Sequence, residues 1–239
     1  MKPGARAAAP GDVIDLWVVP IDQPPAVVGR LRGLLDPEER TRADRAHDPA
    51  QGARFTVARG VVRLLVAERL GIGAAELVWQ HGPHGKPAPL LPSASDRIQV
   101  NWSGSGALAV LAIAEGRRVG ADVEEVRRPG VGERIARRHF PPLDAASVLD
   151  ARTPEEGADR FAELWCRREA CVKVHGARLA QGLGLPLAGP SPVRLGDPGA
   201  LGPGPLWVSD VPVPGPYRAA VAADLDRPFT VRQHDWVPG

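Results

Sequence analysis

The sequence predicts an α+β protein of two related lobes, each a small, mainly antiparallel sheet packed against a long helix. Short β-rich runs separated by Gly, Pro and Ser favour a meander over parallel crossovers. An amphipathic helical segment occurs in each half, and the order of elements recurs. The 239 residues are 44% hydrophobic and 24% charged, enough to bury a core. We place the boundary near 116–119, which gives lobes of residues 1–117 and 118–239.

The first lobe begins with a β-rich run that predicts a strand over 13–19. A charged helix is expected over 35–46, with Asp36 as its N-cap. Apolar residues at helical spacing predict a core helix over 54–70, and Gly71 lies where a C-cap is expected. Three further strand candidates follow, at 78–80, 99–102 and 107–114.

The second lobe opens with a predicted strand over 119–126. Apolar residues on one face predict a helix over 161–174, and late strands are expected over 208–213 and 217–223. Gly and Pro cluster between residues 184 and 216, which predicts long irregular connections there.

Composition excludes several classes of protein. No apolar run approaches the roughly 20 residues that span a bilayer, and the amino terminus lacks the apolar core of a signal peptide, so we expect a cytoplasmic protein without a membrane partner. The net charge of +2 carries no nucleic-acid signature. Cys166 and Cys171, the two cysteines, match neither a disulfide framework nor a zinc pattern.

Lysine is rare in this chain. Of 30 basic residues, only Lys2, Lys86 and Lys173 are lysine. Lysine offers a compact ammonium where arginine offers a planar fork, so a position that keeps lysine against this bias can indicate a need for a point charge. Chance placement is the alternative.

Two carboxylates alternate with apolar residues in the segment VGADVEEV, residues 119–126. In a strand, this alternation directs Asp122 and Glu124 to the same face. Their repulsion can be relieved by a bound cation, and carboxylate, phosphate and water oxygens suit octahedral Mg²⁺. A solvated strand face is the alternative.

Glu169 and Lys173 lie four residues apart on the predicted helix and are therefore neighbours, with Trp165 one turn earlier. The alternative is an exposed ion pair beside a core tryptophan.

Two turn segments complete the set. HGKPAP holds Lys86 between glycine and proline, where an ammonium could contact a phosphate. NWSGSG supplies Ser103, Ser105 and backbone N–H groups that could approach a phosphate, although such a segment is more often a hairpin turn.

In this order the four segments resemble the 4′-phosphopantetheinyl transferase superfamily. Its blocks are a GKP turn, N-x-S-H-S-G, G-x-D-x-E and W-x-x-K-E-x-x-x-K; this chain has GKP, NWSGSG, GADVE and WCRREACVK. The length and internal duplication resemble the larger, monomeric, surfactin-synthetase-activating type, which serves polyketide and nonribosomal peptide synthetases. The resemblance implies two pseudo-twofold-related lobes with coenzyme A in the cleft between them.

The resemblance also implies an activity: Mg-dependent transfer of 4′-phosphopantetheine from coenzyme A to a serine of an apo acyl or peptidyl carrier protein, releasing 3′,5′-adenosine bisphosphate. Asp122, Glu124 and Glu169 would hold Mg²⁺, with Mn²⁺ as an alternative. Glu169, directly or through water, would be the base, and Lys173 would stabilise the departing phosphate. These residues assign the metal site and catalytic helix to the second lobe.

By the same resemblance the first lobe would contact the nucleotide phosphates. Arg54, Lys86, Ser103 and its neighbour Gly104 match the positions concerned. Other arginines, Arg40 and Arg42, lie in a less certain part of the match.

The chain departs from the family at three positions. Gly104 replaces a histidine that contacts the nucleotide end, including its 3′-phosphate; the lost charge-assisted hydrogen bond is worth about 1.5–3 kcal/mol and predicts weaker coenzyme A binding. Arg168 replaces the lysine before Glu169, and Cys166 stands where a small hydroxyl residue is common. Gly104 leaves two alternatives open: a non-catalytic relative that binds a carrier protein or nucleotide, and a transferase with a different donor.

Overall fold

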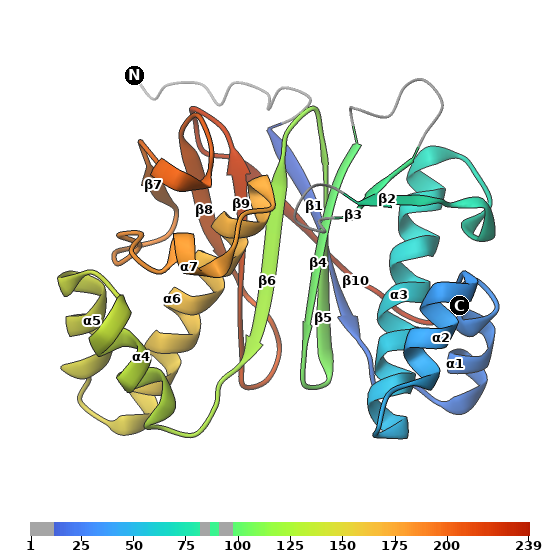
Figure 1. Cartoon of the computed structure of the whole chain (residues 1–239), viewed down its shortest axis with the longest axis horizontal. Helices are drawn as coiled ribbons and strands as arrows, with labels where there is room; N and C mark the ends of the chain where they lie inside the picture. Colours follow the sequence, from blue (N-terminus) through green and yellow to red (C-terminus); the bar gives the residue numbers. More distant parts are fainter. Residues whose placement is uncertain (1–11, 82–86, 91–97) are drawn as a thin grey trace, which may run out of the picture.

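The chain folds into four layers, with two sheets in the middle and helices on either side (Figure 1). The structure is a computed structural model that describes residues 12–81, 87–90 and 98–239. It confirms the α+β class, with a long helix against a four-stranded sheet in each half. The expectation for Lys86 falls outside the described residues.

The first sheet has the strand order β10-β1-β5-β4. Its members are β1 (Val13–Pro20), β4 (Ile98–Ser105), β5 (Leu108–Glu115) and β10 (Thr230–Asp235). The last strand of the chain pairs in parallel with β1, whereas the other pairs are antiparallel. Residues 230–235, which were assigned to the second lobe, therefore pair with the sheet of the first lobe. The division of the chain into lobes at 117–118 stays a proposal.

The second sheet has the strand order β6-β9-β8-β7 and is antiparallel throughout. Its members are β6 (Val119–Glu125), β7 (Val193–Leu195), β8 (Leu206–Val211) and β9 (Tyr217–Asp224). A separate two-stranded sheet pairs β2 (Trp79–His81) with β3 (Pro87–Pro89). The strand predicted at 78–80 therefore forms but does not join the meander.

The facing surfaces of the two large sheets form a shared core. Alternate residues of β1 and β5, such as Leu16 and Val110, pack with Val119 and Ala121 of β6. The opposite residues of β5, including Leu111 and Ile113, pack under the first-lobe helices. Because both faces are covered, β5 is a continuous apolar run and not an alternating one.

Helices cover the outer faces of both sheets (Figure 1). The first group is α1 (Pro25–Arg32), α2 (Pro37–Asp44) and α3 (Pro49–Leu70). The second is α4 (Val131–His139), α5 (Pro142–Leu149), α6 (Pro154–His175) and α7 (Leu179–Gly182). Short 3₁₀ turns occupy Ala74–Glu76 and Gly199–Leu201.

The predicted caps are confirmed. Asp36 accepts a hydrogen bond from Glu39 N and forms a full capping box at the start of α2. Gly71 ends α3 in the left-handed region with φ 66°, which favours glycine. Of the range 184–216, in which the Gly and Pro content predicts irregular connections, residues 184–205 contain only short elements, and β8 occupies 206–211. Across the described residues, no helix combines the length and apolar character needed to cross a membrane.

Candidate active site

A glycine lets α6 approach β6 closely enough to bring their polar residues together. A Cβ atom at Gly120 would lie 2.0 Å from Ala170 O and 2.8 Å from Val174 N, both on the backbone of α6. Only a residue without a side chain fits this contact. Because the apolar residues of β6 face the shared core, Asp122 and Glu124 lie on the opposite face, on the α6 side.

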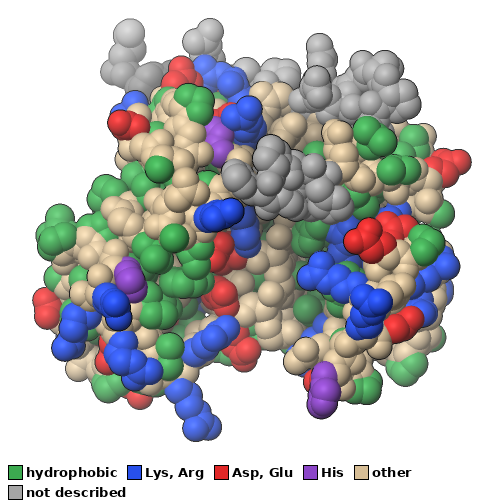
Figure 2. All heavy atoms as spheres, viewed as in Figure 1, with side chains coloured by type: hydrophobic (Ala, Val, Ile, Leu, Met, Phe, Trp, Pro, Cys, Tyr) green, Lys and Arg blue, Asp and Glu red, His purple; other side chains and the backbone are tan. Residues whose placement is uncertain are grey.

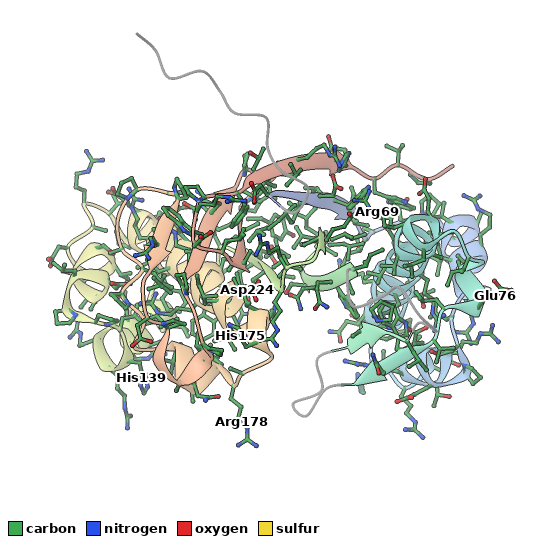
Figure 3. The ribbon with its side chains drawn as sticks, turned by 90° about the horizontal axis from the view of Figure 1, so that it is seen from above. Arg69, Glu76, His139, His175, Arg178 and Asp224 are labelled. Carbon is green, nitrogen blue, oxygen red and sulfur yellow. The ribbon has the colours of Figure 1, made fainter. Side chains whose placement is uncertain are left out.

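The carboxyl end of α6 is tied to the second sheet by Arg118. Its backbone N–H donates to Asp224 Oδ1 at 2.7 Å, and its Nη1 donates to His175 Nδ1 at 2.9 Å. Figure 3 labels His175 and Asp224, which lie close together near the junction of the two halves. These contacts connect the residue before β6 with the end of β9 and the end of α6. They fix the position of α6 relative to β6, the two elements that carry the acids and Lys173.

Lys173 and Asp122 form the centre of the site. Lys173 Nζ donates to Asp122 Oδ1 at 2.6 Å and to Ser103 Oγ at 3.0 Å. The Ser103 hydroxyl also donates to Asp122 Oδ1, at 2.7 Å. The Asp122 side chain is 3% exposed and that of Lys173 is 26% exposed. The ammonium therefore pairs across the two elements with Asp122; no ion pair joins it to Glu169, its described neighbour on the helix.

The two glutamates share an electrostatic environment with Asp122. Burial raises the pKa of Glu169; Lys173 opposes the rise, and the charges of Asp122 and Glu124 add to it. Burial also raises the pKa of Glu124, against a hydrogen bond from Ser105, and the charge of Asp122 raises it further. Three acids from β6 and α6 thus lie near one ammonium. Figure 2 shows acidic side chains in the centre of this face, with basic side chains on both sides.

One buried oxygen fits a divalent cation. Asp122 Oδ2 is buried and has no hydrogen-bond partner among the described residues, which is costly for a carboxylate unless another ligand completes it. Carboxylate oxygens are the donors that Mg²⁺ prefers. Within the described ranges, however, no three acidic, histidine or cysteine side chains are already grouped for a metal ion. Binding would therefore require Glu169 to turn toward Asp122; the Glu169 carboxylate accepts no hydrogen bond from the described residues, whereas Ser105 holds Glu124.

A cleft of about 990 Å³ opens beside Lys173. Arg42, Arg54, Gly104 and Ser105 also line it. Arg54 is bound by Asp22, with Nε donating to Oδ1 at 2.6 Å, and Arg40 is absent from the described lining. Gly104 is exposed, and a Cβ atom there would meet Ala109 Cβ at an ordinary 3.6 Å. The structure thus brings Lys173, Ser103 and the acids together and places Arg54 and Gly104 along the cleft.

Sequence reasoning missed an arginine in the cleft wall. Arg59 is 9% exposed and its guanidinium lies over the rings of Trp79 and Trp102, at 5.0 and 4.4 Å from their centroids. Glu39 accepts from its Nε at 2.8 Å. The sequence signal was weak, because Arg59 is one of four arginines in α3 and both tryptophans are distant in the chain.

Arg168 and Cys166, which depart from the family pattern on α6, have structural roles. Arg168 is fully buried, pairs with Asp144 at 2.6 Å, and donates to carbonyls of Leu164, Leu183 and Leu185. Cys166 is buried, and its thiol donates to Arg218 O at 3.0 Å. Burial, followed by the charges of Asp122 and Glu124, raises the pKa of this thiol.

The sequence of this chain is similar to those of known proteins that share one activity. A family model described as the 4′-phosphopantetheinyl transferase superfamily matches residues 118–199, which contain β6 and α6. The 4′-phosphopantetheinyl transferase HetI of Nostoc sp. is 30% identical over 170 residues, 71% of each chain. The 4′-phosphopantetheinyl transferase Sfp of Bacillus subtilis is 26% identical over 201 residues, 81% of this chain and 84% of that one. The chain belongs to the 4′-phosphopantetheinyl transferase superfamily and is a transferase of the Sfp type.

Proposed function

We propose that this enzyme transfers 4′-phosphopantetheine from coenzyme A to a serine of an apo acyl or peptidyl carrier protein, with Mg²⁺ or Mn²⁺, and releases 3′,5′-adenosine bisphosphate. The observation that carries the proposal is the ammonium of Lys173, which lines the cleft and is bonded to Asp122 with Glu169 one turn away. We further propose that it acts as a cytoplasmic monomer in polyketide or nonribosomal peptide biosynthesis, without nucleic-acid or membrane partners.

Charge supports the binding of a nucleotide donor. Coenzyme A carries three phosphates, and Arg42, Arg54 and Lys173 place cationic groups along the cleft. Charge-assisted hydrogen bonds from such groups are about twice as strong as neutral ones. Arg54 would have to exchange its contact with Asp22 for a phosphate, whereas Lys173 already faces the acids that would meet the reacting pyrophosphate.

Asp122, Glu124 and Glu169 would hold the divalent ion. When bound, the ion would neutralise negative charge on the pyrophosphate. The unpartnered Asp122 Oδ2 supports this assignment, because its burial is unfavourable without a ligand.

The side chains around the acids suit phosphoryl transfer, in which positioning and charge neutralisation supply most of the catalysis. The carrier serine oxygen forms a bond to the β-phosphorus while the bond to the bridging pyrophosphate oxygen breaks. Glu169, directly or through water, accepts the serine proton. Lys173 stabilises the charge that accumulates on the departing 3′,5′-adenosine bisphosphate.

The surface of α4 offers a place for the carrier protein. Arg134, Arg137 and Arg138 are exposed on this helix, and Figure 2 shows basic side chains gathered over that region, at the lower left. An apolar pocket of about 120 Å³ lies next to it, lined by Phe161 and Trp165 among others. An acidic carrier surface would fit this charge, and salt would weaken its binding.

The test incubates the protein with coenzyme A, Mg²⁺ and a panel of apo carrier proteins, and weighs each carrier for the phosphopantetheine increment. Glu169→Gln should lower the rate at least about 100-fold. Glu155→Gln is the matched control, because Glu155 is exposed in the first turn of the same helix. Absence of the increment with every carrier would reject the transfer reaction.

Gly104 leads to one more specific proposal, about which form of coenzyme A the enzyme uses as donor. No histidine contacts the cleft from this position, so the 3′-phosphate of coenzyme A would lose one charged partner. Coenzyme A and its 3′-dephospho form should then be used with similar efficiency. A strong preference for coenzyme A would contradict this refinement and leave the transfer reaction itself intact.

A further inference from the structure

Two serines of β4 face two acids of β6. Ser103 Oγ donates to Asp122 Oδ1 at 2.7 Å, and Ser105 Oγ donates to Glu124 Oε2 at 2.9 Å. The two serines are two residues apart, and so are the acids, so each pair lies on one face of its strand. Each serine binds one oxygen of the acid opposite, and the second oxygen of each acid accepts no hydrogen bond from the described residues.

Ser105 is held in one orientation by a second hydrogen bond. Its Oγ accepts from the backbone N–H of Glu125 at 3.1 Å. A hydroxyl has a single proton to donate. Because the backbone N–H occupies a lone pair of Ser105, the hydroxyl proton is directed to Glu124.

The β4–β5 turn, which follows Ser105, is held in place by contacts with Tyr217 and Glu125. Gly106 has φ 57°, and a Cβ atom there would lie 2.4 Å from the Tyr217 hydroxyl and 2.6 Å from Glu125 Oε2. The next backbone N–H, of Ala107, donates to the Tyr217 hydroxyl at 2.9 Å. The β4–β5 turn therefore rests on β6 and β9, and the position of Ser105 is set by both lobes.

Glu124 needs such a restraint. Its side chain is 25% exposed, and Arg127 lies 3.9 Å from the same Oε2 atom that Ser105 binds. Without the serine, the carboxylate is free to rotate toward that exposed guanidinium and away from Asp122.

We propose that Ser105 is a positioning residue that holds Glu124 Oε2, so that the other carboxylate oxygen is presented to a divalent cation beside Asp122. The proposal rests on the proposed function, because it assumes that Glu124 is a metal ligand. It differs from a direct role of Ser105 in binding phosphate, which its place along the cleft would also allow.

The test measures Mn²⁺ binding to the full chain without coenzyme A, by electron paramagnetic resonance of the free ion. Ser105→Ala should raise the dissociation constant about 10-fold or more, as expected for the loss of a hydrogen bond to a ligand. Ser105→Thr keeps the hydroxyl and should restore binding to within a few fold of wild type. Ser147→Ala is the control, because the Ser147 hydroxyl is also hydrogen-bonded, to Asp144 O at 2.7 Å, but lies exposed on α5 and contacts neither acid of β6. Urea midpoints of all variants are recorded in parallel.

Unchanged Mn²⁺ affinity in Ser105→Ala would overturn the proposal. Glu124→Gln then separates the two failures: if this variant weakens Mn²⁺ binding, the metal site stands and only the serine's role fails; if it does not, the proposed metal site fails as well. If Ser105→Ala and Ser105→Thr both lost Mn²⁺ affinity to the same extent and both had a lowered urea midpoint, Ser105 would have only a structural role. Weaker coenzyme A binding without metal, at unchanged Mn²⁺ affinity, would instead identify a phosphate contact.

Discussion

The contact between Gly120 and α6 makes the sharpest prediction about how the site is built. In Gly120→Ala, the new methyl group would lie 2.0 Å from Ala170 O and 2.8 Å from Val174 N. The first distance is about 1.5 Å shorter than an optimal non-bonded contact. Neither neighbour is a flexible side chain, so the helix backbone itself must move. Overpacking of this kind costs about 1–3 kcal/mol.

The expected effect on activity is larger than the effect on stability. A displacement of about 1 Å at a catalytic group can lower a rate about 100-fold, and α6 carries both Glu169 and Lys173. We expect Gly120→Ala to fold, to lose about 1–3 kcal/mol in the free energy of unfolding measured with urea, and to transfer phosphopantetheine about 100-fold more slowly by intact carrier mass.

Gly29→Ala is the matched control for this substitution. Gly29 lies within α1, and a Cβ atom there meets nothing within 4 Å. Alanine should stabilise the helix by about 0.5–1 kcal/mol without changing the transfer rate. If Gly120→Ala kept wild-type stability and rate, α6 could not rest on β6 as closely as described.

Two predictions concern stability. Burial disfavours the charge of Asp15, but hydrogen bonds from Arg232 and His234 outweigh it and hold the pKa of Asp15 below its usual value. The ionised Asp15 therefore contributes its full share to the free energy of unfolding above the unfolded-state pKa of about 3.9. This share is lost as the pH falls through the lower pKa of the folded state. Asp15→Asn should cost about 1.5–3 kcal/mol in urea at pH 7 and much less at pH 3. Arg168→Met should cost about 3–5 kcal/mol in urea, because it leaves the Asp144 carboxylate buried without its cation.

Each stability prediction has its own control. Arg69 is the partly exposed partner of Asp15, visible in Figure 3 beside β1, and Arg69→Gln should change stability by less than about 1 kcal/mol. An equal loss at pH 7 and pH 3 in Asp15→Asn would contradict the electrostatic explanation. For the buried pair, adding Asp144→Leu to Arg168→Met should recover part of the loss; a double variant that is as unstable as the sum of the single ones would show that the two residues are not coupled.

Local patterns in the sequence predicted most elements that have a strong apolar period or a clear cap. The starts of α3 and α6 were placed too late, at residues 54 and 161, because their first turns are polar; the N-cap residues Asp48 and Thr153 mark the true starts. The helices α1, α4 and α5 were missed because they are short and expose much of their surface. The strand β10 was missed because its residues are mostly partly or fully exposed.

From the amino-acid pattern alone it follows that Asp122 and Glu124 share a face of one strand and that Glu169 and Lys173 are neighbours on one helix, because these relations depend only on the period of the backbone. The pairing of Lys173 with Asp122, 51 residues away, depends on how distant segments pack. The same holds for Gly120, which is a packing position, and for Arg168, which is a buried structural residue. Burial and contacts between distant segments set these roles, and no local pattern specifies which segments meet.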